Sequence, residues 1–125
     1  MSEGTRSPHP NALPNFQKAE VPREKLANYL LDPLHREGQH KARVFKAALD
    51  FEQSSWKELA QAILTELPYH PAALTSEGKW GKKYEVALPI TGRNNSTVDV
   101  LTVWIIRPET SFPTIVTALV LGERE

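Results

Sequence analysis

One apolar stretch, Thr97 to Arg107 (TVDVLTVWIIR), limits what this chain can fold into more than any other segment. The side chains of an extended strand alternate between two faces. Here both faces are apolar, one with Val98, Val100, Thr102, Trp104 and Ile106 and the other with Leu101, Val103 and Ile105. A half-exposed strand alternates apolar with polar residues, whereas a strand covered on both faces is almost continuously apolar. The stretch therefore predicts a central strand that is covered on both sides.

Two further strands are expected beside it. The segment from Lys82 to Ile90 alternates apolar with polar residues and contains Pro89, which favours a half-exposed strand with the proline at an edge or an end. The residues of 91–96 (TGRNNS) predict a turn and an antiparallel return. A second turn at 108–112 leads to a strand from Pro113 to Leu121. Segment 68–81 is bounded by prolines and glycines, and we interpret it as a long connection.

Helices are predicted before the sheet. Pro22 suits the start of a helix that runs from about Arg23 to Leu31, with Leu26, Tyr29 and Leu30 as its apolar stripe. A second helix should run from Gly38 or Gln39 to about Leu49, with a buried stripe of Ala42, Phe45, Ala48 and Leu49.

The third helix has the strongest periodicity. Ser55 and Glu58 predict a capping box at its start, and apolar residues at helical spacing continue to Leu67 before Pro68 ends it. The whole pattern predicts an α+β fold, in which N-terminal helices pack on a C-terminal antiparallel sheet of about three to four strands.

The length of 125 residues is that of one domain, which would bury about two-thirds of its unfolded surface. Residues 1–15 hold three prolines and show no apolar periodicity, so we expect a flexible or loosely docked N-terminal arm. Residues 16–125 would then form a single α+β domain.

The composition excludes several classes of function. Fifteen basic residues balance fifteen acidic ones, so no overall field attracts nucleic acid or an anionic membrane. The absence of cysteine excludes a disulfide framework, a thiolate zinc site and a cysteine nucleophile. No run approaches the roughly 18 apolar residues of a membrane-spanning helix. We therefore expect a soluble, cytoplasmic protein without a membrane partner.

The densest group of chemically active side chains lies from His35 to Arg43 (HREGQHKAR), where two histidines alternate with Arg36, Lys41 and Arg43. Free backbone N–H groups at a helix start would add positive potential there and favour an anion or phosphate. A histidine can also exchange protons at neutral pH. The alternative is an ordinary solvated surface. Because His35 and His40 do not share one helical face, we expect no metal site, and no cofactor is implied.

Thr102 and Thr117 are polar exceptions inside apolar strands. A threonine in such a position commonly serves as a strand former whose hydroxyl bonds locally. If the strand faces the basic helix, the same hydroxyl is placed to donate to a phosphate. Both interpretations stay open from the sequence alone.

Several short motifs together resemble those of a family of small bacterial proteins of unknown function. The motifs are A-x-V-P from Ala19, K-L-x-x-Y-L-L from Lys25, H-x-x-G-x-x-K-A-x-x-F from His35, K-Y-E-V from Lys83 and T-V-W from Thr102. The resemblance covers about 11–118. It picks out Tyr29, His35, Gly38, Lys41, Ala42, Phe45, Phe51, Tyr84, Glu85, Val86, Gly92, Thr102, Val103, Trp104 and Thr117. The chain departs from the pattern at Asp50, at 92–95 and at Leu119-Val120.

This resemblance implies a domain that belongs to toxin–antitoxin-like gene pairs or to the tips of polymorphic toxins. Its order of helices followed by a meander is similar to the fold of barnase-like and RelE-like ribonuclease toxins. The leading hypothesis is therefore a metal-independent ribonuclease-like toxin that acts on RNA phosphodiesters.

In that hypothesis His35 is the general acid or base and Lys41 stabilises the charged phosphate, supported by His40 or Arg93. Thr117 or Thr102 would donate a hydrogen bond. A cognate antitoxin or immunity protein is the expected protein partner. The alternative is a non-catalytic module that binds the product of a neighbouring gene through the sheet edge or the 68–81 connection. Whether the chain is an enzyme stays open at this point.

Overall fold

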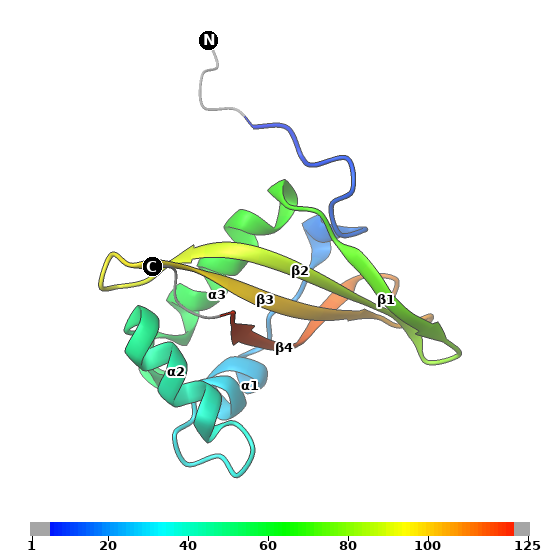
Figure 1. Ribbon diagram of the computed structural model, residues 1–125. Coiled ribbons are helices and arrows are strands. Elements are labelled where there is room, and N and C mark those ends of the chain that lie inside the picture. The colour runs from blue at the N-terminus through cyan, green and yellow to red at the C-terminus, as the bar shows by residue number, and fades with distance from the viewer. Residues whose placement is uncertain (1–5, 122–125) are drawn as a thin grey trace.

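The computed structural model describes residues 6–121. Helical elements come first in the chain and are followed by a four-stranded sheet (Figure 1). The helical elements are η1 (Phe16–Lys18), α1 (Arg23–Lys25), η2 (Leu26–Leu30), α2 (Gln39–Leu49), η3 (Gln53–Ser55), α3 (Trp56–Glu66) and η4 (Leu67–Tyr69). The strands are β1 (Ala73–Gly78), β2 (Gly81–Thr91), β3 (Thr97–Ile106) and β4 (Pro113–Val120). The predicted α+β class is thus confirmed.

The sheet is an antiparallel meander in the order β1-β2-β3-β4, so β3 is a central strand as predicted. One face of β3 is buried against the helices, with Val98, Val100, Thr102 and Trp104. Leu101, Val103 and Ile105 on the other face are only half-buried. The expectation that both faces are covered is therefore wrong, because the second face is only partly shielded from solvent.

Strand β1 replaces the long connection expected over 68–81. It pairs with residues 81–85 of β2, and Gly81, with a φ of 123°, follows the tight turn between the two strands. All six residues of β1 are exposed, so the strand carries none of the apolar alternation by which strands are recognised. Pro89 lies beyond the part of β2 that β1 covers, which explains how a strand with two neighbours accommodates a proline.

The predicted helix from Arg23 to Leu31 begins as α1 and widens into the π-helical turn η2. Helix α2 has the predicted bounds, and its predicted stripe of Ala42, Phe45, Ala48 and Leu49 is buried. The connection between the two depends on Gly38, because a Cβ there would collide with the carbonyl oxygen of Tyr29. Without a side chain at Gly38, η2 packs directly against the start of α2.

Helix α3 follows the predicted stripe, but its start differs from the prediction. The capping box joins Glu52 and Ser55 across η3, and not Ser55 and Glu58. The buried Ser55 hydroxyl accepts a hydrogen bond from the Glu52 backbone N–H at 2.7 Å and donates to the Glu52 carbonyl at 3.0 Å. The hydroxyl is therefore used one turn earlier than the sequence indicated.

The described part of the N-terminal segment contacts the rest of the domain. His9 donates a backbone hydrogen bond to Pro68 at 2.9 Å, Asn11 accepts one from Ala72 at 2.8 Å, and Leu13 is fully buried. Sequence periodicity could not reveal this docking, because main-chain hydrogen bonds require no particular side chains. Residues 1–5 of the expected arm lie outside the described residues.

Candidate functional site

Three elements bring their polar side chains together around Lys41 of α2. The Lys41 Nζ donates to the Thr117 Oγ1 of β4 at 2.8 Å and to the Tyr29 hydroxyl of η2 at 3.2 Å. An ammonium group has three donors and no acceptor, so both hydroxyl oxygens act as acceptors here. Helix packing places Lys41 at this position, because the apolar stripe of α2 faces the core while Lys41 lies on its half-buried margin.

His35 joins this cluster through the ring of Tyr29. The two rings meet edge to face, with centroids 5.0 Å apart and an interplanar angle of 78°. The His35 Nδ1 accepts hydrogen bonds from the backbone N–H groups of Glu37 at 3.0 Å and Gly38 at 2.9 Å. Both N–H groups lie just before the first residue of α2, Gln39. His35 itself therefore orders the turn that leads into the helix.

The environment of Tyr29 favours its ionised form. Hydrogen bonding with Thr117 is the largest cause that lowers the pKa of Tyr29 below its ordinary value, and the nearby ammonium of Lys41 adds to it. Partial burial and the carboxylate of Glu37 act in the opposite direction and do not cancel the effect. A phenol with a lowered pKa beside a cation is typical of groups that take part in proton transfer.

The cluster opens into a cleft of about 550 Å³ between α1, η2, the 33–38 loop and β4. Tyr29, His35 and Thr117 line it, together with the carboxylates of Glu24 and Glu37. A reactant held in this space would therefore contact a phenol, an imidazole and a hydroxyl at once.

Thr102 does not reach this cleft. Its hydroxyl is fully buried, donates to the Val86 carbonyl at 2.7 Å and accepts from the Trp104 Nε1 at 2.8 Å. Both functions of the hydroxyl are satisfied inside the core. Of the two candidate threonines, the structure therefore brings only Thr117 to the cluster.

His40 and Arg93 contact other groups. The His40 Nδ1 lies 3.0 Å from the Arg43 Nη2 on the exposed side of α2. Arg93, in the turn between β2 and β3, lies 3.4 Å from the Glu58 carboxylate of α3. Both side chains are exposed, and neither shares a described hydrogen bond with the Tyr29, His35, Lys41 and Thr117 cluster.

Comparison with known proteins gives a family. Residues 12–122 match the family model described as "Domain of unknown function (DUF6883)". The chain belongs to this family. Its match covers most of the chain and nearly all of the described residues, so the cluster lies wholly within the DUF6883 domain. No curated protein and no solved structure matches the chain.

The hypothesis drawn from the sequence gave no catalytic role to one member of the cluster in this DUF6883 domain. Tyr29 was assigned to the buried stripe of its helix with Leu26 and Leu30, and both leucines are indeed fully buried. Tyr29 is only half-buried, with its hydroxyl at Lys41. A tyrosine placed between leucines at the margin of a stripe is a weak signal, because its hydroxyl requires a polar partner that only the tertiary structure supplies.

Two classes of feature are absent from the described part of the domain. Within 6–121, no group of three or more His, Asp or Glu side chains is placed to hold a metal ion. Over the same residues, no helix is long and apolar enough to cross a membrane.

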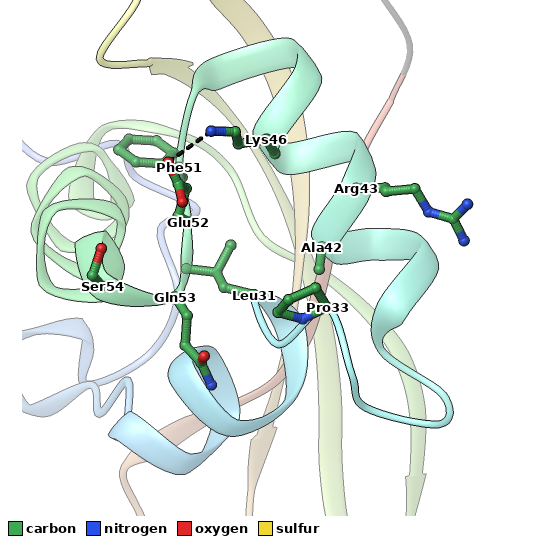
Figure 2. A pocket seen from close by; sticks show the side chains of 9 residues that line it. All are labelled: Leu31, Pro33, Ala42, Arg43, Lys46, Phe51, Glu52, Gln53 and Ser54. Atoms are coloured by element: carbon green, nitrogen blue, oxygen red, sulfur yellow. Dashed lines mark hydrogen bonds and ion pairs between the residues drawn. The ribbon is translucent and has the colours of Figure 1, made fainter.

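A second cavity, of about 430 Å³, lies on another side of α2 (Figure 2). Its apolar lining comes from Leu31, Ala42 and Phe51. Lys46 spans one end of it, with its Nζ 2.6 Å from the Glu52 carboxylate (Figure 2). The charged groups drawn at that end, Lys46 and Glu52, form an ion pair.

Proposed function

We propose that this domain is a metal-independent ribonuclease that cleaves RNA phosphodiesters, in the manner of small bacterial toxins. One observation supports the proposal above all: Lys41 is held by the hydroxyls of Tyr29 and Thr117, and these two residues line an open cleft together with His35. Cleavage of RNA without a metal needs a group that moves a proton and a cation that stabilises the charged phosphate. The cluster holds candidates for both.

Lys41 has the first role in this proposal. Its ammonium is oriented by two hydrogen bonds, so it need not be reorganised when negative charge develops on the phosphoryl oxygens. The Thr117 hydroxyl accepts from Lys41 and helps to hold the ammonium in this position. Because the chain as a whole carries no net charge, this local cation would also provide the attraction that the overall field lacks.

The other residues predicted from the sequence have peripheral roles in this proposal or none. His40 and Arg93 are exposed, and we assign them to the phosphates that flank the cleaved bond rather than to the bond itself. Thr102 is left out of the proposal, because its hydroxyl is already satisfied within the core. The order of helices followed by an antiparallel meander supports the proposal by analogy with ribonuclease toxins, which concerns the fold alone.

The proposal is tested by cleavage of a short single-stranded RNA, followed from its new ends. We expect Lys41→Met to lose at least about 100-fold in kcat/KM, as is typical when a group that stabilises transition-state charge is removed. Methionine keeps an unbranched apolar stem, so the fold should be retained. Lys46→Met, on the same helix and outside the cleft, is the matched control and should cleave at the wild-type rate.

Two results would contradict the ribonuclease proposal. The first is a purified wild-type domain that leaves RNA intact and allows cells that express it to grow normally. The second is a Lys41→Met variant that cleaves as fast as wild type. A DNA strand of the same sequence, which lacks the 2′-hydroxyl, should not be cut. We place the action of such a toxin in the cytoplasm, where RNA substrates are found.

A second candidate function is supported by the outer edge of β1, which pairs with no other strand among the described residues. All six residues of this strand are exposed, and large apolar side chains are exposed at Leu74 and Trp80. An exposed strand edge can pair with a strand of another protein. We propose, as the alternative, a binding module for the product of a neighbouring gene, such as an antitoxin or immunity protein. Thr75→Pro should abolish co-purification of the two products if this is correct, and unchanged co-purification would oppose it.

A further inference from the structure

We propose that Tyr29 accepts the proton of the attacking 2′-hydroxyl, and that His35 acts as a neutral hydrogen-bond donor through its Nε2. This inference rests on the ribonuclease proposal and assigns the proton transfer to a residue to which the sequence analysis gave no catalytic role. Its basis is the pattern of hydrogen bonds around the two rings. That pattern leaves His35 with a proton to donate from Nε2, and it leaves the Tyr29 oxygen able to accept one.

The two backbone hydrogen bonds to His35 determine which nitrogen carries its proton. Nδ1 accepts from the N–H groups of Glu37 and Gly38, so Nδ1 holds the lone pair. In neutral imidazole one nitrogen accepts and the other donates. The ring proton is therefore on Nε2. A general base would need its lone pair on Nε2 and a proton on Nδ1, and that tautomer would break both bonds at the start of α2.

The hydroxyl oxygen of Tyr29 has the opposite character. It accepts a hydrogen bond from the Lys41 Nζ at 3.2 Å, and the Lys41 Nζ also lies 5.5 Å from the centre of the Tyr29 ring. Hydrogen bonding with Thr117 and the charge of Lys41 lower the pKa of Tyr29. A phenolate at this position is thus stabilised by groups from β4 and α2 and can accept a proton from a hydroxyl in the cleft.

Other charged groups border the phenol. From the 33–38 loop, Glu37 faces it and raises its pKa, in opposition to Lys41. From α1, Glu24 and Lys25 line the same cleft with opposite charges. The ammonium of Lys41 is the group bonded directly to the phenol oxygen, and the net effect on the pKa of Tyr29 is a decrease.

The proposed cleavage is a displacement at phosphorus. The Tyr29 phenolate removes the proton of the 2′-hydroxyl, the 2′-oxygen forms a bond to phosphorus, and the bond from phosphorus to the 5′-oxygen breaks. The leaving 5′-oxygen takes a proton from solvent water, and the phenol returns its proton to the resulting hydroxide. The products are a 2′,3′-cyclic phosphate and a 5′-hydroxyl. Lys41 and the Nε2–H of His35 would neutralise charge on the non-bridging oxygens.

The test separates the roles of the two rings with paired variants and a short single-stranded RNA. Tyr29→Phe keeps the ring and removes only the hydroxyl. We expect it to lose about 100-fold or more in kcat with little change in KM, within the range for general acid–base catalysis. In the wild type, kcat should rise with pH as Tyr29 ionises, and this rise should be absent in Tyr29→Phe. A phenylalanine variant that keeps the wild-type rate and pH profile would overturn the inference.

His35→Gln gives the complementary comparison. A glutamine amide can replace the Nε2–H donor but cannot act as a base. If His35 is a donor, His35→Gln should stay within about 10-fold of wild type, while His35→Ala should lose at least about 100-fold. Equal and complete loss in both variants, at unchanged thermal stability, would make His35 the base.

A further measurement needs no RNA. The ¹⁵N chemical shifts of the His35 ring show which nitrogen carries the proton, and we expect Nε2–H at neutral pH. A proton on Nδ1 would overturn the inference even if RNA is cleaved. Conversely, if the wild-type domain leaves RNA intact, the ribonuclease proposal fails together with the role of Tyr29, whatever the ring tautomer.

Discussion

The hydroxyl of Thr102 makes two hydrogen bonds inside the apolar core. It bonds the carbonyl of Val86 and the indole N–H of Trp104, and both Thr102 and Trp104 are fully buried. A buried donor without an acceptor costs roughly 1–3 kcal/mol. Thr102 is thus a structural residue that allows a tryptophan to fill the centre of the core.

Thr102→Val should lower the free energy of unfolding by about 1–3 kcal/mol, because Trp104 loses its acceptor while the side-chain shape is kept. Thr102→Ser keeps the hydroxyl and loses one methyl, so it should cost about 1 kcal/mol. Urea denaturation followed by tryptophan fluorescence measures both changes. A valine variant more stable than the serine variant would show that the hydrogen bonds contribute nothing.

Residue types could not tell Thr102 from Thr117 before the structure was known. Both interrupt apolar strands that are adjacent in the sheet. A β-bulge between β3 and β4 makes the difference: Val103 pairs with Thr117 and Trp104 with Ile115, so one extra residue of β4 shifts the register. Thr117 then meets Lys41, and Thr102 faces the core. Long-range register of this kind is not visible in a single sequence.

At the scale of elements, the glycine between η2 and α2 positions the candidate site. A Cβ at Gly38 would collide with the Tyr29 carbonyl oxygen, so the close approach of these elements depends on this residue. The same approach brings the Tyr29 hydroxyl to Lys41. The site is therefore sensitive to a position that makes no side-chain contact with a substrate.

Gly38→Ala should lower the free energy of unfolding by about 1–3 kcal/mol, since one element must shift to accept the methyl group. It should also reduce RNA cleavage if the proposed function is correct. Gly78→Ala is the matched control, because a Cβ there meets only the indole of the exposed Trp80, which can turn aside. Equal unfolding free energies for wild type and Gly38→Ala would refute the close packing of η2 on α2.

Elements with strong apolar periodicity could be predicted from the sequence, and those without it could not. Helices α2 and α3 and the central strand β3 each carry a stripe that determines their type. Strand β1 has only exposed residues, and backbone pairing with β2 alone makes it a strand. The candidate site was predicted in part: His35, Lys41 and Thr117 come together, whereas Tyr29 was taken for a core residue.

At the scale of the whole molecule, the N-terminal segment completes the core. Leu13 is fully buried. The hydrogen bonds of His9 and Asn11 connect this segment to Pro68 in η4 and to Ala72, just before β1. Further along, Glu20 forms a parallel bridge with Thr114 of β4. The segment before α1 thus contacts both the helical half and the sheet.

Leu13→Ala should lower the free energy of unfolding by about 2–5 kcal/mol, as expected for a large apolar side chain removed from a core. Leu34→Ala is the matched control, because Leu34 is 90% exposed and its truncation should change the free energy by less than about 0.5 kcal/mol. Chemical denaturation measures both variants. If the Leu13 variant were as stable as the Leu34 variant, the docking of the N-terminal segment would contribute little to the fold.

The meander also has a consequence for the speed of folding. Every strand pairs with its neighbour in the sequence, so the sheet can form by successive local hairpins. Closing each short connecting loop costs the chain little conformational entropy. The bridge from Glu20 to Thr114 instead joins distant parts of the chain and should form after the hairpins. Substitutions in the N-terminal segment are therefore expected to accelerate unfolding while leaving the refolding rate almost unchanged.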